Sequence, residues 1–564
     1  MNKIFLKFLE STCNLYECFK KNIYIKISTL IFLLIVVSHF GWIFNQMPHD
    51  DLWHVHSIAR KSLSSVLEIQ SKMFGSLTYR FLHIPLYWFL NIFFGSNWWM
   101  YNSLNVFLHF LNIIIFGKII HNKTRSIEIA SLSLVFLALM PTAVTVFGMR
   151  SLYSTFSTLL LLICLYVFHK RGLTLLNSGV CLLGMLVSLS IYEVPFPSFV
   201  VFGFLIMAGR ERFKYLLFMC MLSFCYLLPN LIFFPKFKMG EIAQRSFEFS
   251  SIIEFLKAPG SIIYIFGVFR DRISGLSWDL ADILKLAISV GLVCFIWNYA
   301  RIEKITKENA KEGFKRLFFY SSGIILPFII TCVLTWSQKP YMYYAPSFGL
   351  SLFVPSVLIL FFRKKITKKI IFFSILFIVI LSNMVLFSSQ RMWKDASKTR
   401  FELFAFLDEY EENRKEMLSI VLINVPRIWQ IPDFLYSQVW VFQNMLEWRY
   451  NLKKERPKTI WYNIIQYYSG VYDVAGFSEI FLKSNTIEID SMSFIDKNKH
   501  VPFSDIYLLG YNNQGFYPIS KVLFYDDNEK NILKFSNFAS KVLKASKPIS
   551  IVEGKGIKKI SYQK

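Results

Sequence analysis

Long apolar runs constrain this chain more than any other feature. Runs of a length suited to crossing a bilayer recur from residue 24 to residue 388 of the 564 residues. A membrane-spanning helix needs about 20 mostly apolar residues, because its backbone hydrogen bonds must be satisfied inside the hydrocarbon. The composition agrees, since 54% of the residues are hydrophobic and only 18% are charged. The sequence therefore predicts a polytopic α-helical membrane protein.

Short basic clusters between the apolar runs predict how the chain is threaded. Basic residues concentrate in cytoplasmic loops. Placing every strongly basic cluster on that side gives about eleven spans, from 24–45 to 370–388, with the N-terminus inside and the C-terminus outside. The first span is expected to be a retained signal anchor, because no cleavage pattern follows it. The basic clusters are the N-terminal tail, 117–125, 169–172, 209–214, 301–316 and 363–369.

Two further regions do not fit the spanning pattern. The outer loop 46–97 contains the amphipathic stretch 52–74 and the short apolar stretch 79–95, which we expect to be helices lying along the outer membrane surface. After residue 395 the composition becomes that of a soluble domain, with an amphipathic helix at 395–417 and strand-like runs after it. We therefore expect a catalytic membrane domain at 1–395 and a small extracytoplasmic α+β domain at 396–564.

Charge and cysteine content exclude several function classes. The net charge of +25 lies largely in the loop clusters, and no nucleic-acid-binding motif is present, so no nucleic-acid partner is expected. No cysteine pair has zinc-ligand spacing with histidines. The predicted inner face has no glycine-rich phosphate loop. Neither a metal nor another cofactor is therefore expected.

The polar residues that are hardest to explain at membrane depth all fall at the predicted outer ends of spans. Ionisable groups in such places usually mark a functional site, so we expect the site at the outer leaflet. The candidates are Asp50, Asp51, Arg80, His83, Arg150, Glu193, Lys339, Tyr341, Tyr343 and Tyr344.

The adjacent acids Asp50 and Asp51 have three interpretations. Either one would serve as the N-cap of a helix beginning near Leu52. Asp51 with His49 and His54 would also suit a divalent metal, an interpretation that is not favoured. The favoured one is a general base that accepts the proton of an attacking hydroxyl.

The remaining candidates also have structural alternatives. Arg80 suits either interface anchoring or binding of a lipid-linked phosphate. Arg150 and Glu193 are boundary residues for which an ion pair is a simple explanation. Lys339 and the tyrosines after it form either an aromatic belt or a site for a headgroup or sugar. A polar stripe, Asn105, His109 and Asn112, is expected to hold helices together by hydrogen bonds.

Taken in order, these motifs resemble the GT-C membrane glycosyltransferases. The resemblance covers residues 1 to about 400 and is strongest to the transmembrane protein O-mannosyltransferases that carry TPR repeats, and to their bacterial relatives. The matching pieces are HDD (49–51), YRFL (79–82), NVFLH (105–109), GMRS (148–151), SIYEVPFP (190–197), YMYYAPSFGL (341–350) and WKD (393–395). The chain departs from the family pattern at Phe81, Leu152 and Tyr192, and no TPR repeat follows.

The resemblance implies transfer of one sugar from a polyprenyl-phosphate donor to an acceptor at the outer leaflet, with inversion. Asp50 or Asp51 would be the base. Arg80, Arg150 and Lys339 would bind the donor phosphate, and His83, Glu193, Tyr341, Tyr343 and Tyr344 would contact the substrate or acceptor.

The function expected from these observations is that of a membrane hexosyl- or pentosyltransferase. It would lie in a bacterial inner membrane among lipids and modify a surface glycan such as lipopolysaccharide O-antigen. The alternatives are a protein O-glycosyltransferase, a glycan polymerase and, from another class, a transporter or flippase of lipid-linked glycans. A transporter should show polar residues at mid-span and inverted repeats.

Overall fold

The computed structural model describes a helical part and a part built from strands. The helical part comprises 23–43, 58, 61–74, 80–95, 97–139, 152–172, 174–233, 280–300, 302, 307–335, 344–360, 369–384, 386–387 and 390. The other described residues form the strands between 419 and 562. The chain divides into two compact units, 1–51 with 58–391 and 52–57 with 392–564. The predicted boundary after residue 395 lies outside the described residues.

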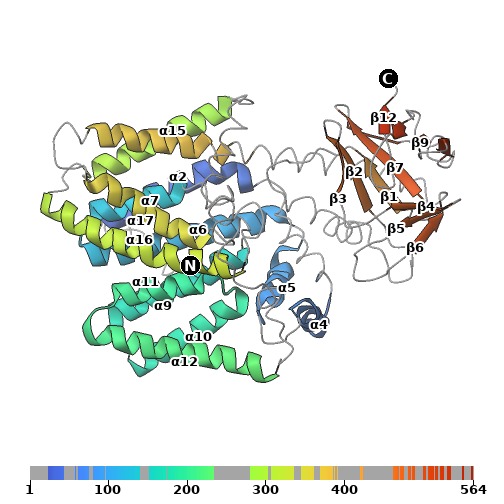
Figure 1. Cartoon of the computed structure of the whole chain (residues 1–564). Coiled ribbons are helices and arrows are strands. Elements are labelled where there is room, and N and C mark those ends of the chain that lie inside the picture. The colour runs from blue at the N-terminus through green and yellow to red at the C-terminus, as the bar shows by residue number, and fades with distance from the viewer. Residues whose placement is uncertain are drawn as a thin grey trace, which may run out of the picture. The chain divides into compact units, whose positions relative to one another are not determined.

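Unit 1 is a helical bundle whose described helices each overlap one of the predicted spans (Figure 1). The helices are α2 (Ile23–Ile43), α6 (Trp98–Thr124), α7 (Ile127–Leu139), α9 (Leu152–Arg171), α10 (Leu175–Ile191), α11 (Phe196–Ile206), α12 (Gly209–Phe233), α15 (Leu280–Tyr299), α16 (Lys307–Thr335), α17 (Tyr344–Leu360) and an unlabelled helix, Lys369–Met384.

Five helices in the described part of the chain are long and apolar enough to cross a membrane. They are Ile23–Gly41, Trp99–Thr124, Leu152–Arg171, Leu280–Tyr299 and Lys311–Ile330. Shorter apolar helices accompany them, among them α7 with 13 residues and α11 with 11. Unit 1 therefore has the build of a multi-pass membrane domain, and the number of crossings stays a prediction.

Small residues let the bundle helices approach one another closely. Gly203 of α11 faces Tyr215 and Leu165, because a Cβ there would meet side-chain atoms of both. Gly323 of α16 faces Leu205 of α11 in the same way. Close backbone approach at small residues is how helices associate where lipid supplies no hydrophobic driving force.

A polar cluster inside the bundle confirms the interpretation of the Asn105, His109 and Asn112 stripe. The Thr155 hydroxyl donates to Oδ1 of Asn105 over 2.7 Å. The Asn112 amide donates to the Thr155 carbonyl over 2.9 Å and to the Tyr344 hydroxyl over 3.0 Å. Nδ1 of His109 lies 2.9 Å from the same hydroxyl. These bonds join α6, α9 and α17.

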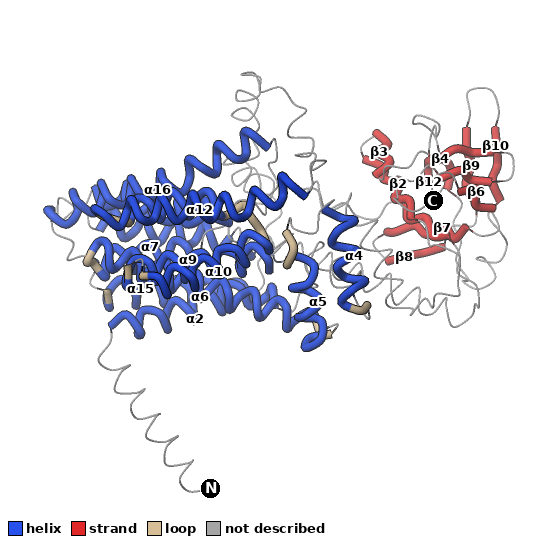
Figure 2. The backbone as a smooth tube through the Cα atoms, turned by 90° about the horizontal axis from the view of Figure 1, so that it is seen from below, coloured by secondary structure: helices blue, strands red, loops and turns tan. Residues whose placement is uncertain are grey.

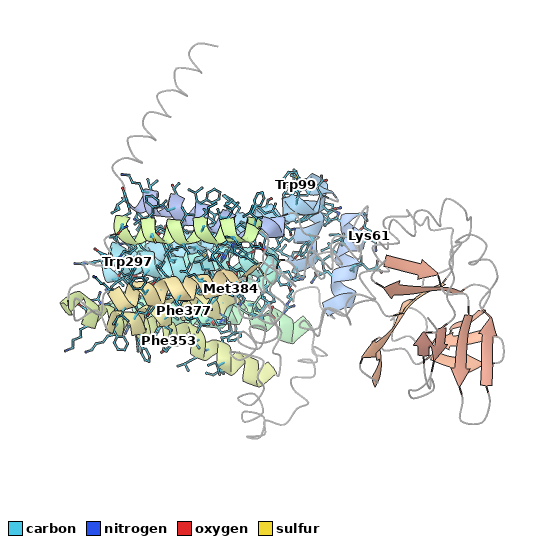
Figure 3. The ribbon with its side chains drawn as sticks, turned by 90° about the horizontal axis from the view of Figure 1, so that it is seen from above. Lys61, Trp99, Trp297, Phe353, Phe377 and Met384 are labelled. Atoms are coloured by element: carbon cyan, nitrogen blue, oxygen red, sulfur yellow. The ribbon has the colours of Figure 1, made fainter. Side chains whose placement is uncertain are left out.

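Two short helices lie at one end of the bundle. They are α4 (Leu63–Phe74) and α5 (His83–Phe94), and Figure 2 shows both running across the direction of the bundle helices. Figure 3 places Lys61 and Trp99 at this end and Trp297 toward the other. The chain thus enters α6 at the α5 end, while α15 finishes at the opposite end, as the threading requires.

Unit 2 is described only as strands. They are β1 (Ser419–Ile423), β2 (Tyr462–Tyr468), β3 (Val471–Ala475), β4 (Ile480–Lys483), β5 (Thr486–Ile489), β6 (Lys499–Pro502), β7 (Ile506–Asn512), β8 (Gly515–Pro518), β9 (Lys521–Tyr525), β10 (Lys530–Lys534), β11 (Ile549–Ile551) and β12 (Ile560–Tyr562). The largest sheet has the order β3-β2-β1-β7-β8. Its apolar central strand β1 is parallel to β2 and β7, and β3 and β8 form antiparallel edges.

Two smaller sheets follow in unit 2. One has the order β10-β9-β11-β12, and the other is an antiparallel meander, β4-β5-β6. The strand-like runs in the sequence coincide with β1, β2, β7 and β9. The helix expected at 395–417 lies outside the described residues, so the α+β class stays a prediction.

Candidate functional site

An arginine–glutamate ion pair joins the start of α5 to the end of α10. Nε of Arg80 donates to Oε2 of Glu193 over 2.7 Å, and Nη2 donates to Oε1 over 2.6 Å. The two side chains remain 15% and 28% exposed. A paired, charge-assisted contact of this kind fixes the plane of the guanidinium as well as its position.

The backbone around the pair explains why these residues meet. Helix α10 ends at Ile191, just before Glu193 and Pro195, and α11 then begins with a proline in its first turn. The Leu82 amide donates to the Ser190 carbonyl over 2.9 Å. This bond holds the entry to α5 against the end of α10.

A buried glutamine connects α4 to the same turn. The Gln70 side chain donates to the Arg80 carbonyl over 2.8 Å and accepts from the Ile84 amide over 3.1 Å. Arg80 has a φ of 50°, a left-handed conformation that is uncommon outside glycine and favours a role for the residue beyond the turn itself. We name this arrangement of Gln70, Arg80 and Ile84 the Gln70 clasp.

Aromatic rings pack around the ion pair. The Arg80 guanidinium lies 5.0 Å from the centre of the Tyr192 ring, a cation–π contact. The Tyr153 ring lies 4.8 Å from that of Tyr192 and 4.4 Å from that of His83. The charged pair is therefore open to solvent on one side and backed by rings on the other.

His83 is a buried, neutral member of this group. Its Nδ1 lies 3.0 Å from the Ile191 carbonyl, which only accepts, so Nδ1 carries the proton. Burial, reinforced by the charge of Arg80, lowers the pKa of His83 to about 3. His83 is thus a neutral imidazole at physiological pH, suited to positioning the chain rather than to binding a phosphate by charge.

The arrangement has a clear chemical capacity. A guanidinium carries five donors in a fixed fork, and Glu193 engages the Nε and Nη2 groups. The pair therefore holds a partly exposed guanidinium in a fixed orientation, with its charge balanced by Glu193. Among the described residues no group of three or more His, Cys, Asp or Glu side chains is arranged to hold a metal ion.

The structure brings together three of the residues expected at the site: Arg80, His83 and Glu193. Tyr344 lies elsewhere, fully buried at the start of α17 with its hydroxyl in the polar cluster of the bundle. The other candidates lie outside the described residues, and their roles stay predictions: Asp50, Asp51, Arg150, Lys339, Tyr341 and Tyr343.

Three members of this site were not expected from the sequence. Gln70 lies in an amphipathic helix, where a further polar residue is ordinary and does not indicate a functional position. Tyr153 lies in a long apolar helix and resembles ordinary packing. In the sequence, Tyr192 stands out only because it departs from the family pattern. Its position next to the candidate Glu193 is the one feature that could have drawn attention to it.

Comparisons with known proteins identify no family for this chain. No protein-family model matches it, and no curated protein matches it. Among solved structures, a match is the crystal structure of ArnT from Cupriavidus metallidurans bound to undecaprenyl phosphate, at 9% identity. The match covers 78% of this chain and 92% of that one, with a TM-score of 0.28. A superposition this loose assigns no residue of one chain to a residue of the other.

Proposed function

We propose that the protein is an inverting membrane glycosyltransferase. It moves a monosaccharide from a polyprenyl-phosphate donor to an extracytoplasmic acceptor, a bacterial surface glycan such as lipopolysaccharide O-antigen. The observation that carries the proposal is the Arg80–Glu193 pair at the end of the bundle that bears the surface helices α4 and α5. This is where the phosphate of a lipid-linked donor would lie.

Arg80 stabilises the leaving phosphate in this reaction. As the bond between the anomeric carbon and the phosphate oxygen breaks, negative charge grows on the polyprenyl phosphate. An oriented guanidinium placed at that charge lowers the barrier, because it needs no rearrangement during the reaction. Glu193 balances the guanidinium before the donor binds and holds its plane afterwards. Arg150 and Lys339 supply further positive charge.

Asp50 or Asp51 is the general base. Its carboxylate takes the proton of the acceptor hydroxyl while the hydroxyl oxygen forms a bond to the anomeric carbon. The polyprenyl phosphate leaves from the opposite face of the sugar, so the configuration inverts. His83 and Tyr344 hold the protein framework, and Tyr341 and Tyr343 contact the sugar or acceptor.

An assay with the purified full chain tests the base. Polyprenyl-phosphate sugars and surface-glycan acceptors would be incubated with wild type, Asp50→Asn and Asp51→Asn. Loss of a general base costs typically about 10²–10⁴-fold in rate. We expect one variant to fall in that range and the other to change less. Wild-type rates in both variants, alongside an active wild type, would refute the assignment of the base.

A second variant tests the phosphate-binding role of Arg80. Arg80→Lys keeps the charge and loses the fork, so we expect transfer to fall roughly tenfold, which corresponds to the loss of one charged hydrogen bond. Arg125→Lys is the matched control, because Arg125 ends α6 far along the chain from α5 and also has a positive φ. Equal losses in both variants would indicate a backbone effect rather than donor binding.

The buried polar cluster favours one rival function. A transporter or flippase of lipid-linked glycans needs polar groups within the bundle, and Asn112 lies midway along α6. The two functions predict different products. A transferase yields a glycosylated acceptor in detergent, where no gradient or second compartment exists, and a flippase yields none.

A further inference from the structure

Three cations from three helices lie together at the opposite end of the bundle from α5. They are Lys123 of α6, Arg212 of α12 and Arg316 of α16. The charges of Arg316 and Arg212 both act on the Lys123 ammonium. The charges of both arginines also act on Tyr320, so both lie near that side chain. We name these three residues the basic cluster.

Hydrogen bonds fix two of these cations in place. Nη1 of Arg316 donates to the Lys123 carbonyl over 2.7 Å. Nε of Arg212 donates to the Phe204 and Met207 carbonyls over 3.1 and 3.2 Å. The two guanidiniums therefore cap helix C-termini, because the carbonyls that accept their hydrogen bonds lie in the last turns of α6 and α11. The positions follow from the fold and not from flexible side chains meeting by chance.

The cluster carries more positive charge than is balanced by the carboxylate and the helix ends that contact it. Glu312 pairs with Arg316 but is 66% exposed. The C-terminal ends of α6 and α11 contribute about half a negative charge each. Three cations against one carboxylate and two helix ends leave an excess of about one positive charge. Orienting a membrane protein requires basic loops, but it does not require cations from three helices to converge.

Apolar side chains continue from the cluster along the same helices. Leu216 follows Arg212 by one turn and is 46% exposed, and Leu217 beside it is 55% exposed. Phe319 follows Arg316 by three residues and is 56% exposed. This arrangement fits a phospholipid. The cations suit the phosphate of the headgroup, and the exposed apolar side chains along the spanning helices suit the acyl chains.

We propose that Lys123, Arg212 and Arg316 bind the phosphate of an anionic phospholipid from the leaflet on that side, which the threading makes cytoplasmic. The acyl chains would lie along the exposed faces of α12 and α16. Basic sites between spanning helices on the cytoplasmic side bind anionic headgroups by this combination of charge and shape. The site lies apart from the Arg80–Glu193 pair and does not depend on the transferase proposal.

Lipid binding to the purified full chain tests this site. Native mass spectrometry would count bound dioleoyl phosphatidylglycerol and dioleoyl phosphatidylcholine, with inorganic phosphate as a competitor. We expect phosphatidylglycerol to bind preferentially. Lys123→Gln should weaken that binding roughly fivefold, which corresponds to about 1 kcal/mol for one basic residue near a headgroup. Lys123 is chosen because Arg316 bonds to its backbone carbonyl and not to its ammonium, so Lys123→Gln removes the charge and keeps that hydrogen bond.

Lys214→Gln is the matched control. Lys214 is on α12 close to Arg212, carries the same charge and pairs with Glu211 over 2.6 Å. We expect its loss to leave phosphatidylglycerol binding within twofold of wild type. Equal weakening by Lys123→Gln and Lys214→Gln would overturn the proposal in favour of a general surface-charge effect. Equal binding of the two lipids, or full displacement by millimolar phosphate, would overturn it as well.

Discussion

At the scale of single residues, the site depends on a conformation that most side chains avoid. Arg80 adopts a positive φ, and the Gln70 clasp binds its carbonyl and the following Ile84 amide. A left-handed conformation costs a non-glycine residue roughly 1–2 kcal/mol, which the clasp and the bond from Leu82 to Ser190 offset. The position of the guanidinium against Glu193 therefore follows from a backbone that these hydrogen bonds fix.

His83 should make the stability of unit 1 depend on pH. The buried imidazole has a pKa of about 3, whereas an exposed histidine titrates near 6.5. Between these values the unfolded chain binds a proton that the folded chain does not, so stability is full above pH 6.5 and falls as the pH drops toward 3. The thermal midpoint of the detergent-solubilised protein should therefore decrease from pH 7 to pH 4.5.

His83→Asn isolates the contribution of this imidazole. An asparagine amide is able to donate to the Ile191 carbonyl but does not titrate. We expect this variant to lose less of its thermal midpoint between pH 7 and pH 4.5 than wild type does. The same loss in both proteins would assign the pH dependence to other groups.

At the scale of elements, α11 is short and tightly packed. Its Gly203 faces Tyr215 of α12 and Leu165 of α9 at distances that leave no room for a side chain. Gly203→Ala should destabilise unit 1 by about 1–3 kcal/mol, the usual cost of overpacking a filled core. A shift of the thermal midpoint to lower temperature measures this.

Gly291→Ala in α15 is the comparison for Gly203→Ala. A Cβ at Gly291 meets nothing within 4 Å, so alanine there should be neutral or stabilising by up to roughly 1 kcal/mol. If the two substitutions shift the midpoint alike, the close approach of α11 to its neighbours would not limit stability.

The sequence predicts most helices of unit 1 but only part of the site. Apolar length locates each bundle helix, because it is a local property, but the basic clusters 117–125, 209–214 and 301–316 lie largely within α6, α12 and α16 rather than in loops between helices. The sequence assigns Glu193 to substrate or acceptor contact, with an ion pair as the structural alternative, and nothing local indicates that the partner is Arg80, 113 positions away. The Gln70 clasp is harder still to predict, since it depends on how α4 meets α5.

At the scale of the whole molecule, the threading predicts opposite sides for the two ends of the bundle. Asn97, before α6, and Lys170, in the last turn of α9, are both exposed. In a cysteine-free background, Asn97→Cys should react with an impermeant maleimide in intact cells. Lys170→Cys should react only after the cells are permeabilised.

Labelling of both positions in intact cells would refute the threading. So would the reverse pattern, and the proposed outer site at Arg80 and Glu193 would then face the cytoplasm. Cys220, which is exposed on α12, shows why the native cysteines must be removed before either position is tested.

The Gln70 clasp also makes two positions of the chain depend on one amide group. Ten positions separate Gln70 from Arg80 and fourteen separate it from Ile84, and both bonds come from one amide group. The bond to the Arg80 carbonyl needs a donor and the bond from the Ile84 amide needs an acceptor, and the side-chain amide of Gln70 supplies both. Related chains that keep this site should therefore retain an amide side chain at the position of Gln70.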